Sequence, residues 1–338
     1  MGDRIERRAY AKVNLGLDIT GLREDGYHLV RMVMQQIGLY DVLTFEKQAA
    51  PGVQLRLTED CTIPDIADMP LDDRNLIVRA AKAVLEKYQI RCGVTITLEK
   101  HIPMAAGMAG GSTDCAAALQ GVAELFETGA TPEELAELGV RLGADVPYCL
   151  MGGTALAEGI GEKLTRLPDL PPCQFLIIKP SFGVSTKEVY TSYDSQDPAA
   201  VVHPDIDGMV AALQAGDLRG VTDRLGNVLE PVTVANHPEI SKIEACLREL
   251  GVMSTIMTGS GPTVFGILPA GAGAEGSGTE AASPESAVGE AIQAGVAAAS
   301  PENTMIDDEP AVVPDIPALQ EKLAAEGISA MIFLTSQE

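Results

Sequence analysis

Apolar and polar positions alternate along the first part of the chain in a way that predicts a sheet with helices. A period of two between turn residues predicts strands at residues 7–19, 33–46, 53–58 and 94–99. Apolar residues at helical spacing predict a helix over residues 75–89, and an Ala- and Leu-rich run predicts another over 113–127. Thr131-Pro132-Glu133-Glu134 has the residues of a capping box, so a third helix should begin there and reach residue 142.

The rest of the chain mixes strands and helices. A strand is expected at 151–157, and the Pro-rich stretch 168–172 indicates a boundary between a first domain of residues 1–165 and a second of residues 166–338. Two domains agree with a length of 338 residues. Further strands are predicted at residues 175–179, 252–257, 263–268 and 328–334, and helices at residues 206–215, 217–228, 238–250 and 316–326.

Residues 269–314 interrupt this pattern. They contain eight acidic residues and no Lys or Arg, and small or turn-forming residues fill most of the rest. Such a segment buries too little apolar surface to offset an ordering entropy of about 1–2 kcal/mol per residue, so we expect a flexible acidic insertion. Gly271-Ala272-Gly273-Ala274-Glu275-Gly276 matches G-x-G-x-x-G within it. We expect no dinucleotide site there, because no strand-helix-strand unit surrounds the match.

Composition and charge narrow the classes of function. Apolar residues make up 46% of the chain and charged residues 21%, which is typical of a globular protein. A net charge of -24 disfavours nucleic acid or an anionic membrane as a partner, so an anionic substrate must be held by local cations or backbone N–H groups. The six cysteines include no C-x-x-C pair, and the first residues leave no room for a signal peptide. We therefore expect free thiols and a cytoplasmic protein.

A glycine-rich loop is the most informative motif. Residues 103–114 read Pro-Met-Ala-Ala-Gly-Met-Ala-Gly-Gly-Ser-Thr-Asp and lead directly into the Ala-rich helix. Glycines let backbone N–H groups converge on a ligand, and a helix start adds unpaired N–H groups with partial positive charge, which suits a phosphate. Ser112 and Thr113 add hydroxyls near a bound phosphate or its metal. The loop alone also fits a strand-to-helix connection that needs glycine only for packing.

Three further segments place polar residues in apolar surroundings. Lys12 and Asn14 share one face of the opening strand and need polar partners or a cavity. Asp145 lies in Gly143-Ala144-Asp145-Val146-Pro147, where a carboxylate could act as a base or only cap a turn. Thr258-Gly259-Ser260-Gly261-Pro262-Thr263 joins two apolar runs, as a hairpin turn also would. None of these segments is specific alone.

Together, these segments resemble the GHMP kinase superfamily. The resemblance is carried by Ala11-Lys12-Val13-Asn14-Leu15, Asp25-Gly26-Tyr27-His28, Asn75-Leu76-Ile77-Val78-Arg79-Ala80-Ala81, the loop and helix at 103–119, Gly143-Ala144-Asp145-Val146-Pro147 and Thr258-Gly259-Ser260-Gly261-Pro262. It covers essentially the whole chain except the insertion. The second and fifth of these segments are the specific ones, and they resemble the branch that phosphorylates 4-diphosphocytidyl-2-C-methyl-D-erythritol.

The resemblance implies an α+β fold of two domains that enclose a cleft. The N-terminal domain would be ribosomal-S5-domain-2-like and the C-terminal domain ferredoxin-like. The implied activity is ATP-dependent phosphorylation of the substrate's 2-hydroxyl in the non-mevalonate isoprenoid pathway. ATP would be the co-substrate and Mg²⁺ the accompanying ion, with its ligands unidentified. Monomer and homodimer both stay open.

The resemblance also implies roles residue by residue. Asp145 matches the catalytic base and Lys12 the cation beside it, which suits the needs of phosphoryl transfer. Asn75 and Lys100 match positions near the nucleotide. The other residues expected to bind ATP form the glycine-rich loop: Pro103, Met104, Ala105, Ala106, Gly107, Met108, Ala109, Gly110, Gly111, Ser112 and Thr113. The residues expected to bind the substrate are Tyr27, His28 and Tyr190 at its cytosine, Asn14 at its methylerythritol hydroxyls, and Thr186.

The chain departs from the family pattern in its loop, and two rival functions stay open. Thr113 stands where Ser is usual, and Ala105, Ala106 and Ala109 stand where Gly is frequent. A homoserine or mevalonate kinase would share the loop, although Asp25-Gly26-Tyr27-His28 argues against it. A non-catalytic sensor that keeps the fold is the other alternative, against which the intact catalytic pair argues.

Overall fold

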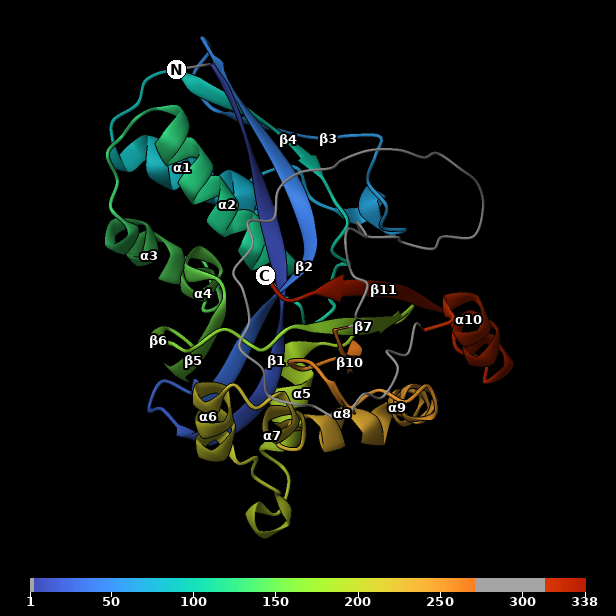
Figure 1. Ribbon diagram of the computed structural model, residues 1–338. Helices are drawn as coiled ribbons and strands as arrows, with labels where there is room; N and C mark the ends of the chain where they lie inside the picture. Colours follow the sequence, from blue (N-terminus) through green and yellow to red (C-terminus); the bar gives the residue numbers. More distant parts are fainter. Residues whose placement is uncertain (1–2, 271–313) are drawn as a thin grey trace, which may run out of the picture.

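A computed structural model describes residues 3–270 and 314–338 of the chain, which Figure 1 shows as a ribbon. Residues 271–313 hold most of the predicted insertion and its G-x-G-x-x-G match, and these two predictions fall outside the described residues. The described elements form two sheets with helices packed against them.

The larger sheet has seven strands within the described ranges. Their bounds are Arg4–Leu22 (β1), His28–Gln48 (β2), Val53–Leu57 (β3), Gly93–Glu99 (β4), Thr154–Gly159 (β5), Lys163–Arg166 (β6) and Gly226–Asn227 (β8). The order is β3-β4-β2-β1-β8, with β5 pairing β2 and β6 pairing β5. Strands β1 and β2 are the long diagonal pair in Figure 1. The β1 register shifts between Tyr10 and Lys12 and again between Asn14 and Gly16, which gives this stretch two irregularities.

Four helices pack on the larger sheet. They span Leu76–Lys87 (α1), Gly110–Leu125 (α2), Pro132–Val140 (α3) and Val146–Met151 (α4), and they lie together beside β1 and β2 in Figure 1. Apolar positions of α1 and α2 bury against Phe45 of the sheet. The predicted capping box of α3 is confirmed, because the Thr131 hydroxyl accepts the N–H of Glu134 while the Glu134 carboxylate accepts that of Thr131.

The smaller sheet joins the first through a shared core. Its strands are Cys173–Pro180 (β7), Ser254–Met257 (β9), Val264–Pro269 (β10) and Ala330–Ser336 (β11), all antiparallel in the order β11-β7-β10-β9. Phe175 and Phe265 belong to the same buried cluster as Val13 and Leu15 of β1. The remaining helices span Thr186–Tyr193 (α5), Ile206–Ala215 (α6), Leu218–Thr222 (α7), Glu230–Asn236 (α8), Glu239–Glu249 (α9) and Ile316–Ala325 (α10), with 3-10 turns at Ile66–Asp68 and Pro198–Ala200.

Several predicted elements need correction. The helix expected over 217–228 ends at Thr222, because the Asn227 side chain donates to the carbonyls of Met257 and Gly259 and its backbone pairs with β1 as β8. The strand expected from 151 begins at Thr154, since Gly152 and Gly153 form a turn at positive φ after α4. The pattern missed α4, α5, α8 and β6. The expected boundary between 165 and 166 falls within β6, and its position stays a prediction.

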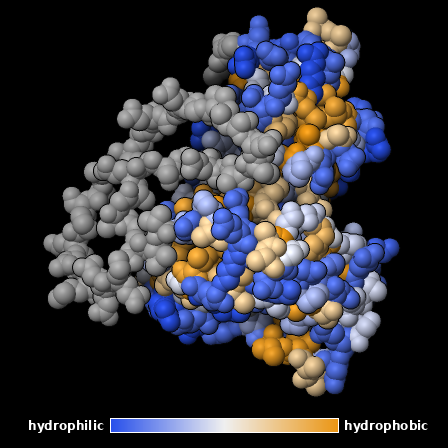
Figure 2. Space-filling view, turned by 90° about the vertical axis from the view of Figure 1, so that its right-hand side faces the viewer, coloured by the Kyte–Doolittle hydropathy of each residue, from blue (hydrophilic) through white to orange (hydrophobic). Residues whose placement is uncertain are grey.

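The face that Figure 2 shows is largely polar. Hydrophilic side chains cover much of it, with separate apolar areas in its upper part, in its lower part and at its lower edge. No helix within the described ranges has both the length and the hydropathy that a membrane span requires.

Candidate active site

One large cavity collects most of the residues singled out in the sequence. It has a volume of about 970 Å³, and its lining residues come from segments between Lys12 and Ser260. The glycine-rich loop lines one part, Tyr27, His28 and Tyr190 line another, and Lys12 and Asp145 also border it. Such a volume is at the upper end for small-molecule sites, which leaves room for more than one ligand.

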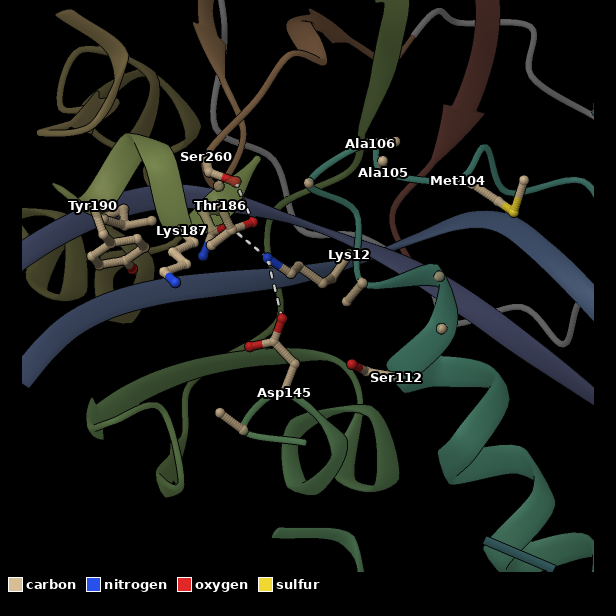
Figure 3. Close-up of a pocket in the computed structure, with 18 of the residues that line it drawn as sticks. Lys12, Met104, Ala105, Ala106, Ser112, Asp145, Thr186, Lys187, Tyr190 and Ser260 are labelled. Carbon is tan, nitrogen blue, oxygen red and sulfur yellow. Dashed lines mark hydrogen bonds and ion pairs between the residues drawn. The ribbon is translucent and has the colours of Figure 1, made fainter. Parts of the chain in front are cut away.

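Lys12 and Asp145 face each other across this cavity, as Figure 3 shows. The Lys12 Nζ atom lies 3.8 Å from the Asp145 carboxylate and donates a 2.7 Å hydrogen bond to the Asn14 side-chain oxygen. The Lys12 side chain is buried, whereas that of Asp145 is 32% exposed. The site therefore places a buried ammonium beside a carboxylate that is partly open to the cavity.

Sequence and structure agree on why Lys12 and Asn14 meet. Both belong to β1, where side chains two residues apart share one face. Asp145 is the residue that precedes α4, a helix that the sequence pattern did not predict. The structure therefore brings together three polar residues from two places in the sequence.

The glycine-rich loop precedes α2 and lines the cavity with short side chains. The lining residues are Pro103, Met104, Ala105, Ala106, Gly107, Ala109, Gly110, Gly111 and Ser112. The Ala109 carbonyl accepts the N–H groups of Ser112 and Thr113. The N–H groups of Gly110 and Gly111, which have no partner within the described residues, are left for a ligand. Ala105 and Ala109 have φ values of 49° and 58°, in the region where glycine is unstrained. This explains why glycine would suit both positions.

Two loop residues expected to bind ATP point elsewhere. The Met108 side chain is buried in the core between the sheets, and its carbonyl accepts the N–H of Lys12. The Thr113 hydroxyl donates to the carbonyl of Tyr10 at 2.7 Å, so it is occupied by β1 and lies outside the cavity. We correct the expectation that this hydroxyl is near a phosphate. That of Ser112 lines the cavity.

The second glycine turn packs directly on the first. Gly107 has a φ of 71°, and a Cβ atom there would lie 2.5 Å from the carbonyl oxygen of Thr258. A Cβ on Gly259 would in turn lie 3.1 Å from the carbonyl oxygen of Gly107. Backbone meets backbone at this contact, which is why both positions require glycine. The turn that seemed unspecific in the sequence therefore supports the loop.

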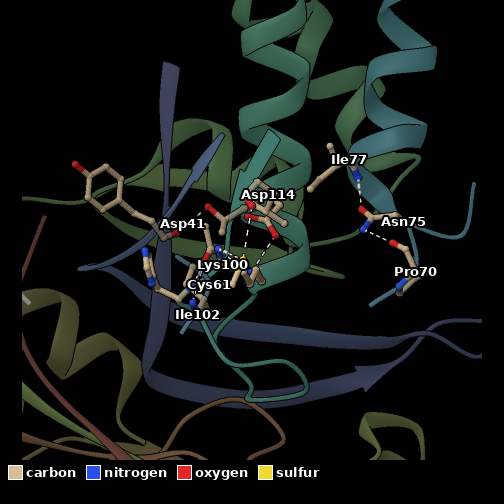
Figure 4. A network of polar contacts seen from close by, with 12 residues as sticks. Asp41, Cys61, Pro70, Asn75, Ile77, Lys100, Ile102 and Asp114 are labelled. Atoms are coloured by element: carbon tan, nitrogen blue, oxygen red, sulfur yellow. Dashed lines mark hydrogen bonds and ion pairs between the residues drawn. The ribbon is translucent and has the colours of Figure 1, made fainter. Parts of the chain in front are cut away.

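Lys100 lines the cavity, but its ammonium is paired with two carboxylates (Figure 4). Its Nζ atom donates to Asp41 and, at 2.9 Å, to Asp114, and all three side chains are buried. Although burial opposes it, the two carboxylates raise the pKa of Lys100. Asp41 also accepts the N–H groups of His101 and Ile102, which tie down the start of the loop. A contact between Lys100 and the nucleotide stays a prediction.

Asn75 borders the cavity at the start of α1. Its side-chain oxygen accepts the N–H of Ile77 at 2.8 Å, and its amide nitrogen donates to the carbonyl of Pro70 at 2.8 Å (Figure 4). The side chain is therefore a helix cap. Its expected contact with ATP stays a prediction.

The far part of the cavity has aromatic walls. The rings of His28 and Tyr190 lie 4.8 Å apart, and His28 Nε2 lies 2.6 Å from the carboxylate of Asp194. Burial, with a smaller contribution from the charge of Asp145, raises the pKa of Tyr190 to about 12. Tyr27 is 58% exposed, a large exposed ring at the cavity edge. These three rings are suited to contact a flat base.

No group of three or more His, Cys, Asp or Glu side chains within the described residues could hold a metal ion. Asp145 and the Ser112 hydroxyl supply oxygen atoms to the cavity. Mg²⁺ characteristically takes one or two protein oxygens together with phosphates of a bound nucleotide, and these residues fit that mode.

Sequence reasoning missed the supporting residues. Lys100 was singled out, but not its partners Asp41 and Asp114, which are 59 and 14 positions away. His28 was singled out, but not Asp194, which is 166 positions away. Thr258 hydrogen-bonds Asn14 across 244 positions. A single sequence carries no signal for such pairs, except that buried charges need partners.

Family models match the chain in two places. Residues 75–153 match the GHMP kinases N terminal domain, and residues 209–299 match the GHMP kinases C terminal. A protein of Lachnospira eligens named 4-diphosphocytidyl-2-C-methyl-D-erythritol kinase is 50% identical over 79% of this chain and 90% of its own length. The protein of that name from Lachnoclostridium phytofermentans is 47% identical over 79% of this chain and 88% of its own.

Solved structures give the same picture. A crystal structure of 4-(cytidine 5'-diphospho)-2C-methyl-D-erythritol kinase superposes with a TM-score of 0.66 and 33% identity, over 79% of this chain and 91% of that one. A homoserine kinase from Cytophaga hutchinsonii superposes with a TM-score of 0.70 over 99% of this chain and 95% of its own, at 16% identity, which shows the fold alone. The α+β fold of two family domains expected from the sequence is thus confirmed.

Proposed function

This chain belongs to the GHMP kinases, and on that premise we propose that it transfers the γ-phosphoryl group of ATP to the 2-hydroxyl of 4-diphosphocytidyl-2-C-methyl-D-erythritol. The products are the 2-phosphate and ADP. Relatives of 45–50% identity bear the name of that kinase, and the reaction belongs to isoprenoid precursor synthesis by the non-mevalonate route. The observation that carries the proposal is the Lys12–Asp145 pair, which borders a cavity with the glycine-rich loop in one part and the rings of Tyr27, His28 and Tyr190 in another.

Asp145 acts as the base in this proposal. Its carboxylate is partly open to the cavity and can accept the proton of the substrate hydroxyl as the oxygen attacks the γ-phosphorus. Lys12, 3.8 Å away, stabilises the charge on the transferring phosphoryl group. Asn14 accepts a hydrogen bond from Lys12 and is placed to contact the methylerythritol hydroxyls. Because phosphoryl transfer depends mainly on positioning and electrostatics, these groups suffice on the protein side.

The two ligands occupy opposite parts of the cavity. ATP binds with its phosphates on the loop of residues 103–112, where the N–H groups of Gly110 and Gly111 and the positive end of α2 meet them. The cytosine lies against Tyr27, His28 and Tyr190, and Thr186 borders the substrate between base and loop. Bound Mg²⁺ would neutralise phosphate charge, held by the nucleotide with Ser112 or Asp145. We also propose a cytoplasmic location.

The deciding experiment offers three acceptors to the purified protein. ADP release would be followed with ATP, Mg²⁺ and the cytidyl substrate, and in parallel with homoserine and mevalonate. We expect turnover with the cytidyl substrate only. Turnover of homoserine or mevalonate in its place would overturn the substrate, and a folded protein that binds ATP yet turns over none of the three would favour the sensor alternative.

A further inference from the structure

The charged side chains of the cavity pair off with one exception. Its lining contains three Lys and three Asp residues: Lys12, Lys100, Lys187, Asp114, Asp145 and Asp194. Lys12 lies beside Asp145, Lys100 bonds Asp114 and Asp41, and Asp194 bonds His28. Within the described part of the chain, Lys187 forms no ion pair and its ammonium no hydrogen bond.

Lys187 lies between the two ends of the cavity. It belongs to the first turn of α5, three residues before Tyr190, so both side chains lie on the same side of that helix. Figure 3 shows Lys187 beside Tyr190, on the side toward Lys12. Its neighbour Thr186 bonds Ser260 of the second glycine turn at 2.9 Å, which fixes the start of α5 against the other wall.

The proposed substrate has its parts in this same order. A cytosine at Tyr190 and a reacting hydroxyl at Asp145 place the diphosphate between them. In a chain of net charge -24, that dianionic group needs a local cation. The loop N–H groups serve the other anion, ATP, and the charges of Lys12 and Lys100 already face carboxylates.

We propose that Lys187 binds the diphosphate of the cytidyl substrate and thereby sets the preference for cytidine diphosphates over uncharged cytidine ligands. This inference rests on the proposed function and adds a specificity residue to it. Lys187 is exposed before the ligand arrives, so its ammonium is free to swing onto either phosphate. It contributes to binding in the ground and transition states alike, so its loss should raise the substrate KM and leave kcat unchanged.

The test compares two ligands that differ only in the diphosphate. CDP and cytidine would be titrated by calorimetry into the wild-type chain and into Lys187→Met at low salt. We expect CDP to bind about five- to ten-fold more weakly to the variant, which is the size of one partly exposed charge-assisted contact, and cytidine to bind within two-fold. Raising the salt should weaken CDP binding to the wild type more than to the variant.

Matched variants separate charge from shape. Lys187→Arg keeps the charge and should retain most of the CDP affinity, whereas Lys242→Met removes an exposed lysine of α9 outside the cavity and should change nothing. In steady-state assays, Lys187→Met should raise the KM for the cytidyl substrate alone, leaving kcat and the KM for ATP as they were.

Three outcomes would overturn the inference. Unchanged CDP affinity in Lys187→Met would exclude the contact, and equal weakening of CDP and cytidine would show that Lys187 only shapes α5. A wild-type chain that neither binds CDP nor turns over the cytidyl substrate would overturn the proposed function as well, so the two failures are distinguishable.

Discussion

The hydroxyl of Thr258 accepts a hydrogen bond from the backbone N–H of Asn14 at 2.9 Å, which ties the second glycine turn to the strand that carries Lys12. The Thr258 hydroxyl also lies 3.4 Å from the Asn14 side-chain oxygen, the atom that accepts from Lys12. Thr258, Asn14, Lys12 and Asp145 thus form one chain of contacts. Thr258 touches no reacting atom, so it is a positioning residue.

We predict that Thr258→Val lowers kcat about ten-fold and the free energy of unfolding by about 1–3 kcal/mol. Valine has the same shape but leaves the buried N–H of Asn14 without its acceptor, which costs free energy and loosens Lys12. Thr258→Ser, which keeps the hydroxyl, should restore kcat. A valine variant with normal kcat would show that the contact only holds the fold together.

Asp145→Asn should reduce kcat by about 10²–10⁴-fold, because the amide cannot take the proton of the acceptor hydroxyl. The side chain is partly exposed and makes only a 3.8 Å contact with Lys12, so thermal unfolding should change little. ADP release under saturating substrates measures the effect. Near-normal turnover from the folded variant would remove Asp145 from the mechanism.

Gly107→Ala should lower the free energy of unfolding by about 2–3 kcal/mol and raise the KM for ATP. Its φ of 71° disfavours a side chain, and the added Cβ would press on the Thr258 carbonyl. Gly111→Ala is the control for stability, since its Cβ would meet only Leu76 at 3.9 Å and alanine favours the helix. Urea unfolding of both variants decides; equal midpoints would contradict the steric argument.

The mix of strands and helices and the identity of the polar cavity residues could be predicted, because both depend on local pattern. The two-residue period of β1 placed Lys12 and Asn14 on one face, and the capping residues located the start of α3. The Ala-rich run behind the glycine loop predicted α2 for the same reason.

The parts that could not be predicted depend on distant residues. Asn227 leaves its helical neighbourhood because the carbonyls of the second glycine turn accept its side chain. Thr113 was expected at the phosphate, but the Tyr10 carbonyl occupies its hydroxyl. Helix α4 has only six residues, which are too few to show a helical period. Asn227 and Thr113 each have a partner whose position the local pattern does not give.

Stability should depend on pH through the half-buried Glu230 and the buried Glu244 near β9. Burial, and then the charge of Glu244, raises the pKa of Glu230 to about 8 from its ordinary 4.5. Between these values the folded chain holds a proton that the unfolded chain has released, so the free energy of unfolding falls as pH rises, by up to about 1.4 kcal/mol per unit. Above pH 8 this contribution levels off.

Glu230→Gln is the matched test of that prediction. Glutamine stays neutral and keeps an oxygen to accept the N–H of Met257, as Glu230 does at 2.7 Å. Between pH 5 and 8, urea unfolding should show a shallower decline for the variant than for the wild type, with the variant the more stable at pH 8. Parallel curves would mean that Glu230 is ionised throughout this range.

The bond between Thr258 and Asn14 also bears on the timing of synthesis. A ribosome that adds about 5–20 residues per second needs roughly 12–50 s to make the stretch between them. During that interval Lys12 and Asn14 are present without the turn that orients them, and until Asn227 is made β1 lacks its neighbour β8 as well. A nascent chain released before Thr258 therefore carries the chemical groups of a kinase without their alignment, and its activity begins only near the end of translation.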